Sequence, residues 1–163
     1  MLKLEYRLLH PSEETDACNL VNRVFNQFIA TYYTTQGMQE FQKYANPAAM
    51  RQRLLDGNLV LVAAALHEIV GVIEMRGHSH VSLLFVDQAY QGQGISKELL
   101  HWALTICRQH HPLLTEVTVN ASPNAVPVYE RLGFVATDVQ QEKNGILFTP
   151  MILKLRPDEL ALA

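Results

Sequence analysis

The sequence predicts a mixed α/β domain in which helices flank a central, mostly antiparallel sheet. The length of 163 residues suits one domain that can bury a core. Hydrophobic residues make up 48% and charged residues 18% of the chain, which is typical of a folded globular protein. Stretches with strand and helix periodicity follow each other in the order β-α-α-β-β-β-α-β-α-β-β. We therefore expect a single domain over residues 1–163, without repeats or linkers.

Composition indicates which kinds of partner and which cellular compartment to expect. The formal net charge of -3 argues against a basic surface for nucleic acid. Cys18 and Cys107 lie far apart and form no CxxC pair, which favours a reduced protein in the cytoplasm. The first residues, MLKLEYRLLH, are charged and alternating, so we expect a strand there and not a signal peptide. Because no apolar run is long enough to span a bilayer, we expect no membrane partner.

The first part of the chain predicts a strand followed by helices. Residues 2–9 alternate in the manner of a strand, and Ser12 is expected to cap the helix that follows. Gly37 interrupts the helical pattern, and two short helices are expected over residues 38–45 and 47–55. The apolar stripe of the first helix is expected to contain Ala17, Leu20, Val21, Val24, Phe25, Phe28, Ile29 and Tyr32.

The middle of the chain predicts three strands and a long helix. Residues 59–66 and 69–76 are apolar and branched, and we expect them to pair through a turn at HE. The segment GHSH turns the chain into residues 81–86, which do not alternate, so both faces of that strand are expected to be covered. A helix over residues 94–110 follows. Its inward face is expected to carry Ile95, Leu99, Trp102, Ala103 and Ile106.

The last part predicts a strand, a short helix and a strand pair. The strand TEVTVNA is followed by a helix over residues 124–132, with Gly133 as its C-cap. Residues 134–140 and 146–155 are expected to pair through a turn near KNG. This pair could form the surface of a homodimer or an ordinary part of the core, and its residues fit both interpretations.

The stretch YQGQGISKELL joins an apolar strand to a helix. A helix start has unpaired N–H groups and a positive dipole end, and glycine lets a ligand approach the backbone closely, so such a loop suits a phosphate. The spacing differs from the GxxxxGK[ST] of a Walker A loop, and Lys97 stands where a dinucleotide loop, GxGxxG, has its third glycine. A plain connecting turn is the structural alternative.

Two motifs give the chain a resemblance to the GNAT superfamily of acyl-CoA-dependent N-acyltransferases. VDQAYQGQGISKELL resembles the signature [RQ]xxGx[GA]: Gln91 and Gly94 match, and Ser96 replaces the final small residue. VPVYERLGF resembles a second signature, a Tyr-Glu pair followed by Gly-Phe. The resemblance is clearest from Asn58 to Phe134. It implies a GNAT-like fold and transfer of an acetyl group from acetyl-CoA to a primary amine in a ternary complex, without a metal.

The resemblance also implies how acetyl-CoA is held. The pyrophosphate would lie on backbone N–H groups of the glycine loop, and the pantetheine arm along the preceding strand, one N–H of which would polarise the thioester oxygen. Ser122 stands where many members have an asparagine, and Asn120 and Asn124 are alternatives. The residues implied for the cofactor are Leu84, Phe85, Val86, Gln91, Gly92, Gln93, Gly94, Ile95, Ser96, Lys97, Ser122 and Asn124.

The resemblance implies Tyr129 as the general acid. A phenol with a pKa of ~10 can protonate a leaving thiolate whose pKa is ~8.5. The structural alternative is an amphipathic core tyrosine whose hydroxyl is hydrogen-bonded elsewhere.

His80 and Glu74 are the two candidate bases, and water is a third. Counting with a period of two places His80 on the strand face of Leu84 and Val86, and imidazole titrates in the useful range. Glu74 lies on the preceding strand and could act directly or through water. An exposed turn histidine is the alternative for His80. The alternation of His78 and His80 lacks a third clear ligand and predicts no metal site.

In this family the first helices and the loop between them usually determine which acceptor is bound. Here that region is aromatic, and Phe28, Tyr32 and Tyr33 are the expected pocket residues. Phe28 and Tyr32 also fit the inward stripe, whereas Tyr33 does not. No acidic or basic cluster indicates a polyamine or an anionic acceptor, so a small amine, an amino acid, an antibiotic or a protein amino group all fit. The rival hypothesis is a catalytically silent module that binds acyl-CoA.

Overall fold

The structure is a computed structural model that describes residues 3–156, so the ends of the expected domain, 1–163, lie outside the described residues. The helices are α1 (Glu14–Phe28), η1 (Ala30–Tyr32), α2 (Thr35–Tyr44), α3 (Pro47–Leu55), η2 (Gln88–Tyr90), α4 (Ile95–His110) and α5 (Val126–Arg131). The strands are β1 (Leu4–Leu8), β2 (Leu59–Ala65), β3 (Glu68–Arg76), β4 (His80–Val86), β5 (Glu116–Ala121), β6 (Val135–Ala136), β7 (Gln141–Lys143) and β8 (Ile146–Lys154).

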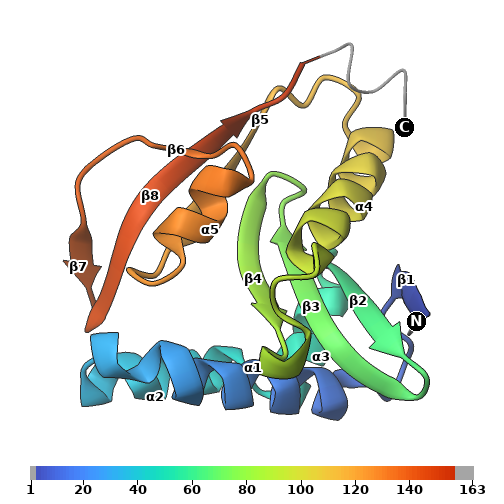
Figure 1. The fold of residues 1–163 in the computed structure, drawn as a ribbon, viewed down its shortest axis with the longest axis horizontal. Helices are drawn as coiled ribbons and strands as arrows, with labels where there is room; N and C mark the ends of the chain where they lie inside the picture. Colours follow the sequence, from blue (N-terminus) through green and yellow to red (C-terminus); the bar gives the residue numbers. More distant parts are fainter. Residues whose placement is uncertain (1–2, 157–163) are drawn as a thin grey trace.

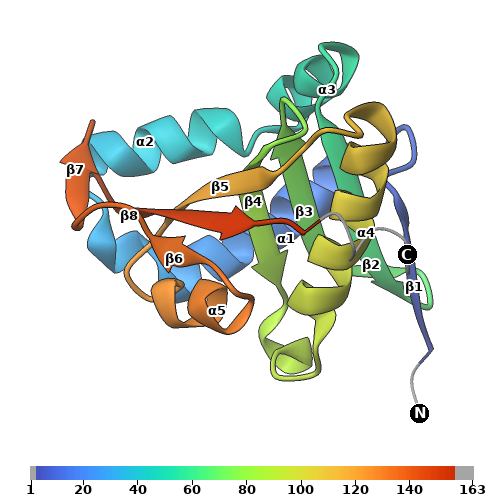
Figure 2. The same cartoon turned by 90° about the horizontal axis from the view of Figure 1, so that it is seen from above.

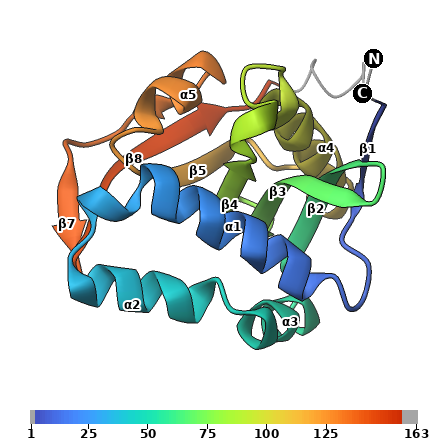
Figure 3. The ribbon, with the colours of Figure 1, turned by 60° about the horizontal axis from the view of Figure 1, so that its bottom comes forward.

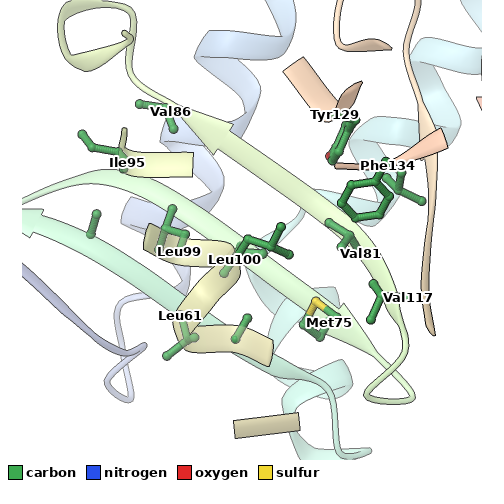
Figure 4. Packing of buried hydrophobic residues seen from close by; sticks show 14 of the residues in the cluster. Leu61, Met75, Val81, Val86, Ile95, Leu99, Leu100, Val117, Tyr129 and Phe134 are labelled. Atoms are coloured by element: carbon green, nitrogen blue, oxygen red, sulfur yellow. The ribbon is translucent and has the colours of Figure 1, made fainter. Parts of the chain in front are cut away.

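One open mixed sheet organises the molecule, with the strand order β1-β2-β3-β4-β5-β8-β6 and with β7 paired to β8. The helices α1, α2 and α3 cover one face, and α4 and α5 cover the other (Figures 1 and 3). Each face has its own cluster of buried apolar side chains. Figure 4 shows part of the cluster beneath α4 and α5. The predicted mixed α/β class with a flanked central sheet is confirmed. Within residues 3–156, no helix combines the length and the hydropathy needed to cross a membrane.

The sheet opens between its two parallel neighbours, β4 and β5. They pair only where they begin, at His80–Thr118 and Val81–Val119. Beyond that point they diverge, and Figure 1 shows the resulting gap between the green and the orange half of the sheet. Figure 2 shows from above that β5 and β8 run at a steep angle to β4. The edge of β4 that faces β5 is therefore unpaired along most of its length within the described chain. An unpaired strand edge inside a sheet is a place where an extended ligand can add hydrogen bonds.

A bulge interrupts β4 at Ser82. Strand β3 pairs Glu74 with Leu83 but Met75 with Val81, so Ser82 is an extra residue on β4. Such a bulge bends the strand and reverses the inward and outward alternation of the residues before it. The alternation of β4 must therefore be counted separately on the two sides of Ser82.

The bulge corrects the predicted face of His80. Its register places His80 on the face of Leu83 and Phe85, and thus opposite to Leu84 and Val86. The predicted shared face was wrong because counting with a period of two has no room for an inserted residue. The expectation that β4 is covered on both faces is met only in part, since buried and half-buried residues alternate along it.

The first helix differs from the prediction at both ends. Ser12 is not the cap: it has a φ of 75°, and the helix begins after Glu13, whose carboxylate accepts hydrogen bonds from the His10 N–H and from Arg7. At the other end, α1 stops at Phe28 and a 3-10 turn follows. Because the helical spacing does not continue, Tyr32 is exposed and leaves the predicted stripe.

Two further expectations about helices need correction. Gly37 does not interrupt a helix but lies inside α2, where a β-carbon would overlap the carbonyl group of Gly145. Trp102 is 44% exposed, because the buried stripe of α4 follows Leu99, Ala103 and Cys107 in four-residue steps and Trp102 lies beside it.

The predicted strand over residues 134–140 is largely wrong. Only Val135 and Ala136 pair with β8, and the chain then leaves the sheet. The side chain of Asp138 accepts hydrogen bonds from the Val139 N–H and the Gln141 amide, which favours a turn there. The chain returns as β7, which forms a hairpin with β8 through Asn144 and Gly145, both at positive φ, so the turn near KNG is confirmed.

Candidate active site

A groove of about 540 Å³, here called the main groove, lies between β4, the loop before α4, and α5. It is lined by most of the residues predicted for the cofactor: Leu84, Phe85, Val86, Gln91, Gly92, Gly94, Ile95, Ser96 and Asn124. Gln93 and Lys97 were predicted too, but they are exposed and do not line the groove. Sequence reasoning missed the remaining wall, which is mostly apolar: Val24, Ile29, Tyr90, Ala125, Val128, Arg131 and Leu132.

The glycine loop shapes one end of the main groove. Gly92 and Gly94 have φ values of 78° and 81°, and no atom lies within 4 Å of the place where either would carry a β-carbon. Gly94 is the N-cap of α4, and no side chain caps the helix. The first N–H groups of α4 are thus free to bind an anion. The Gln91 amide donates a 3.0 Å hydrogen bond to the Val86 carbonyl, which ties the loop to the end of β4.

An ion pair that the sequence did not predict fixes the start of this loop. Asp87 accepts a hydrogen bond from the Ala89 N–H at 2.9 Å and one from Arg23 of α1 at 2.6 Å. The hydrogen bond from Arg23 holds the pKa of the Asp87 carboxyl below its ordinary value. Because the partners are 64 residues apart, neither motif contains both of them. The pair joins the helix at the side of the groove to the strand that leads into the loop.

Tyr129 lies on α5 and lines the main groove. The residue is 6% exposed, and its ring packs edge-on against Phe134 with 5.3 Å between the centroids (Figure 4). Burial raises the pKa of the Tyr129 phenol above its ordinary range, so the phenol keeps its proton at neutral pH. No group within residues 3–156 hydrogen-bonds to the phenol oxygen. The hydroxyl therefore has a proton that it can donate to a ligand in the groove.

A second cavity of about 90 Å³, here called the small hollow, adjoins the main groove. The two share part of their lining: Ile29, Leu84, Phe85, Ala125 and Tyr129. Of the predicted acceptor residues, Tyr33 lines the small hollow, Phe28 lines the main groove, and Tyr32 lines neither. Ser122 and Asn120 also line the small hollow, and the Ser122 hydroxyl donates to the Asn124 side-chain oxygen at 2.8 Å.

The two candidate bases lie outside both cavities. His80 Nδ1 is 2.8 Å from the Thr118 hydroxyl oxygen. Burial, with a smaller contribution from Arg76, lowers the pKa of His80 to about 4. His80 is therefore neutral at pH 7, and it does not line the groove or the hollow.

Glu74 is fully buried, and both of its carboxylate oxygens accept hydrogen bonds. The carboxylate accepts two hydrogen bonds from Arg53, at 2.7 and 3.0 Å, one from Asn58 at 2.7 Å and one from the Tyr44 hydroxyl at 3.2 Å. This network joins α2 and α3 to β3 and favours a structural role. Within the described part of the chain, no three His, Cys, Asp or Glu side chains are close enough to hold a metal ion.

Comparisons with known proteins agree with this arrangement. A family model described as Acetyltransferase (GNAT) domain matches residues 29–155. An uncharacterized N-acetyltransferase of Escherichia coli (strain K12), YafP, is 26% identical over 161 residues, which cover 96% of this chain and 99% of that protein.

Solved structures share the fold. A GCN5-related N-acetyltransferase from Rhodopseudomonas palustris superimposes with a TM-score of 0.79 at 22% identity, covering 95% of this chain and 98% of that one. The PaiA N-acetyltransferase from Thermoplasma acidophilum, in complex with coenzyme A, gives a TM-score of 0.77 at 17% identity, covering 94% and 100%.

Proposed function

The chain belongs to the GNAT acetyltransferase family, and from this premise we propose that it transfers the acetyl group of acetyl-CoA to a primary amine by direct attack in a ternary complex. The observation that carries the proposal is the position of Tyr129. Tyr129, whose protonated hydroxyl has no partner among the described residues, lines both the main groove and the small hollow, where a thioester and an amine would meet. A group with a proton to give at that junction suits a reaction that expels a thiolate.

We propose that the main groove holds acetyl-CoA. The free N–H groups at the start of α4 would bind the pyrophosphate, and Gly92 and Gly94 leave room for it. The unpaired edge of β4 would pair with the amides of the pantetheine arm. Arg131 is the one charged side chain in the described lining of the groove, and its cation suits a further phosphate group.

In the proposed mechanism the amine nitrogen attacks the thioester carbon, and an N–H of β4 stabilises the tetrahedral oxyanion. The carbon–sulfur bond then breaks, the electron pair leaves with sulfur, and Tyr129 gives its proton to the thiolate. The amide and free CoA are the products, and solvent returns a proton to the phenolate. Because His80 and Glu74 face neither cavity, we propose that water takes the proton of the incoming ammonium.

The test is release of free thiol from acetyl-CoA by the purified protein in the presence of a panel of primary amines. Thiol release that needs an amine and yields the N-acetylated amine supports the proposal. Tight binding of CoA without turnover across the panel would contradict it and favour the silent acyl-CoA-binding module.

A further inference from the structure

The small hollow carries an inference about the acceptor, which rests on the proposed function. We infer that the acceptor is a compact primary amine whose substituent carries no charge, because the small hollow of about 90 Å³ has no charged side chain in its lining.

The hollow opens where the reaction would take place. Tyr129 and Leu84 belong to the lining of both cavities, and so does Ala125 at the start of α5. An amine whose nitrogen reaches the thioester beside Tyr129 has its substituent directed either back along the cofactor or into the small hollow. With acetyl-CoA in the main groove, the small hollow is the space left for the substituent.

The walls of the hollow are uncharged: aromatic rings form one part, and Ser82, Asn120 and Ser122 contribute polar but neutral groups. The rings of Phe25 and Phe41 stack with centroids 3.9 Å apart, Tyr33 packs edge-on against Phe25 at 4.8 Å, and Phe85 lies 6.0 Å from Phe41. No Asp, Glu, His, Lys or Arg of residues 3–156 lines the cavity. Burial raises the pKa of the Tyr33 phenol to about 12, so this hydroxyl also stays neutral.

An uncharged wall selects against a charged substituent. A carboxylate, a phosphate or a second ammonium placed there would lose its hydration without gaining a partner of opposite charge. Glu74 offers no help to a cation, because its carboxylate already accepts hydrogen bonds from Arg53, Asn58 and Tyr44. Amino acids and diamines should therefore be poorer acceptors than their uncharged counterparts.

The size of the hollow limits the substituent. Its volume of about 90 Å³ is smaller than the roughly 150 Å³ of an engineered cavity that binds benzene. A propyl or branched butyl group fits such a space, whereas a phenyl ring needs the wall to move. Phe41 forms much of that wall from α2, so its removal should admit larger groups.

The hairpin of β7 and β8 holds the wall in place. The backbone of Tyr33 forms a bridge with Ile146, and the Thr34 N–H donates a 3.0 Å hydrogen bond to the Gly145 carbonyl. Gly37 of α2 packs against the same glycine, where a larger residue would overlap the backbone. These contacts fix the segment that carries Tyr33 and so hold this wall of the hollow in place.

The experiment compares amines in matched pairs with saturating acetyl-CoA. Isobutylamine and valine differ by a carboxylate, and butylamine and 1,4-diaminobutane differ by a second amino group. For each pair we expect kcat/KM of the uncharged member to be at least ten-fold higher at a pH where equal fractions of the reacting amine are unprotonated. Isobutylamine should also exceed benzylamine and a lysine-containing peptide.

Variants of one wall residue test the size argument. Phe41→Ala, and Phe41→Leu as the milder change, should raise the ratio of benzylamine to isobutylamine turnover at least five-fold, in line with the cost of misfitting a pocket. Tyr32→Ala is the matched control, because this neighbouring aromatic side chain lines neither cavity and should leave the ratio unchanged.

The outcomes separate the two proposals. Preference for valine, 1,4-diaminobutane or the peptide over the uncharged amines overturns the inference about the acceptor while leaving acetyl transfer intact. A benzylamine ratio that does not move in either Phe41 variant also overturns it. If no amine releases thiol although acetyl-CoA binds, the proposed function itself fails, and the inference fails with it.

Discussion

Two buried polar side chains, one on each face of the sheet, have opposite surroundings. Glu74 belongs to the face covered by α1, α2 and α3, is fully buried, and has its carboxylate saturated by Arg53, Asn58 and Tyr44. Tyr129 belongs to the face covered by α4 and α5, is almost as buried, and has a hydroxyl that no described residue bonds.

The difference indicates what each group does. Folding selects partners for buried polar groups, because an unpaired one is costly. The Glu74 carboxylate is held by four hydrogen bonds and lines neither cavity, whereas the hydroxyl of Tyr129, which lines both, has a proton and a lone pair to offer a substrate. The comparison therefore assigns Glu74 to stability and Tyr129 to chemistry.

The largest expected effect is the loss of stability in Glu74→Ala. Removing the carboxylate leaves Arg53 as a buried cation without its partner, which typically costs about 3–5 kcal/mol of unfolding free energy. Urea denaturation monitored by circular dichroism measures it. Glu116→Ala is the control: it removes a partly exposed pair with Lys154 and should cost less than about 1 kcal/mol. A Glu74→Ala protein that is stable but has lost turnover would contradict the structural role and indicate that Glu74 is catalytic.

Tyr129→Phe should lose turnover and keep its stability, which is the reverse of the expectation for Glu74→Ala. We expect kcat to fall at least ten-fold, equivalent to about 1.4 kcal/mol in the barrier, while unfolding free energy changes little because the hydroxyl has no partner to lose. The matched variant is Tyr44→Phe, which removes a hydrogen bond to Glu74 and should lose about 1 kcal/mol of stability while keeping its turnover. Unchanged turnover in Tyr129→Phe would remove the phenol from the mechanism.

Gly94→Ala and Gly57→Ala extend the comparison from side chains to the backbone. Both glycines have positive φ and open space around them, so alanine should cost about 1–2 kcal/mol of stability at either position. Only Gly94 lies in the main groove. We therefore expect the KM for acetyl-CoA to rise several-fold in Gly94→Ala alone. An equal rise in Gly57→Ala would show that the effect comes from general loosening of the fold.

The sequence predicts this site well where local chemistry determines it. The glycine loop and the Tyr129 segment are short motifs whose backbone geometry follows from their own residues, and both were predicted at the right places. The bulge at Ser82 was not predicted, because its sequence gives no break in the apolar pattern, and the face of His80 was wrong as a result. The Glu74 network and the Arg23–Asp87 pair depend on residues brought together from distant segments. Such pairings leave no periodic signal.

The smallest expected effect is the contribution of His80 to the pH dependence of stability. It has one hydrogen-bond partner, Thr118, and faces neither cavity, so the comparison groups it with Glu74. Its pKa is about 4 in the folded protein and ~6.5 in an unfolded chain. Between these values the unfolded chain binds more protons, so stability falls as the pH drops from about 6.5 towards 4. The side chain is only partly buried, and the effect is therefore smaller than those above.

Replacing the imidazole should remove this pH-dependent contribution to stability without changing turnover. His80→Gln should flatten the decline in the urea midpoint between pH 7 and pH 5, and His67→Gln, in the exposed turn between β2 and β3, is the control for loss of an imidazole. The pH dependence of kcat separates the two roles. If water accepts the proton of the ammonium, the acidic limb of the profile persists in His80→Gln. A lost limb would make His80 the base and would show that a bonded side chain outside both cavities can still take part in the reaction.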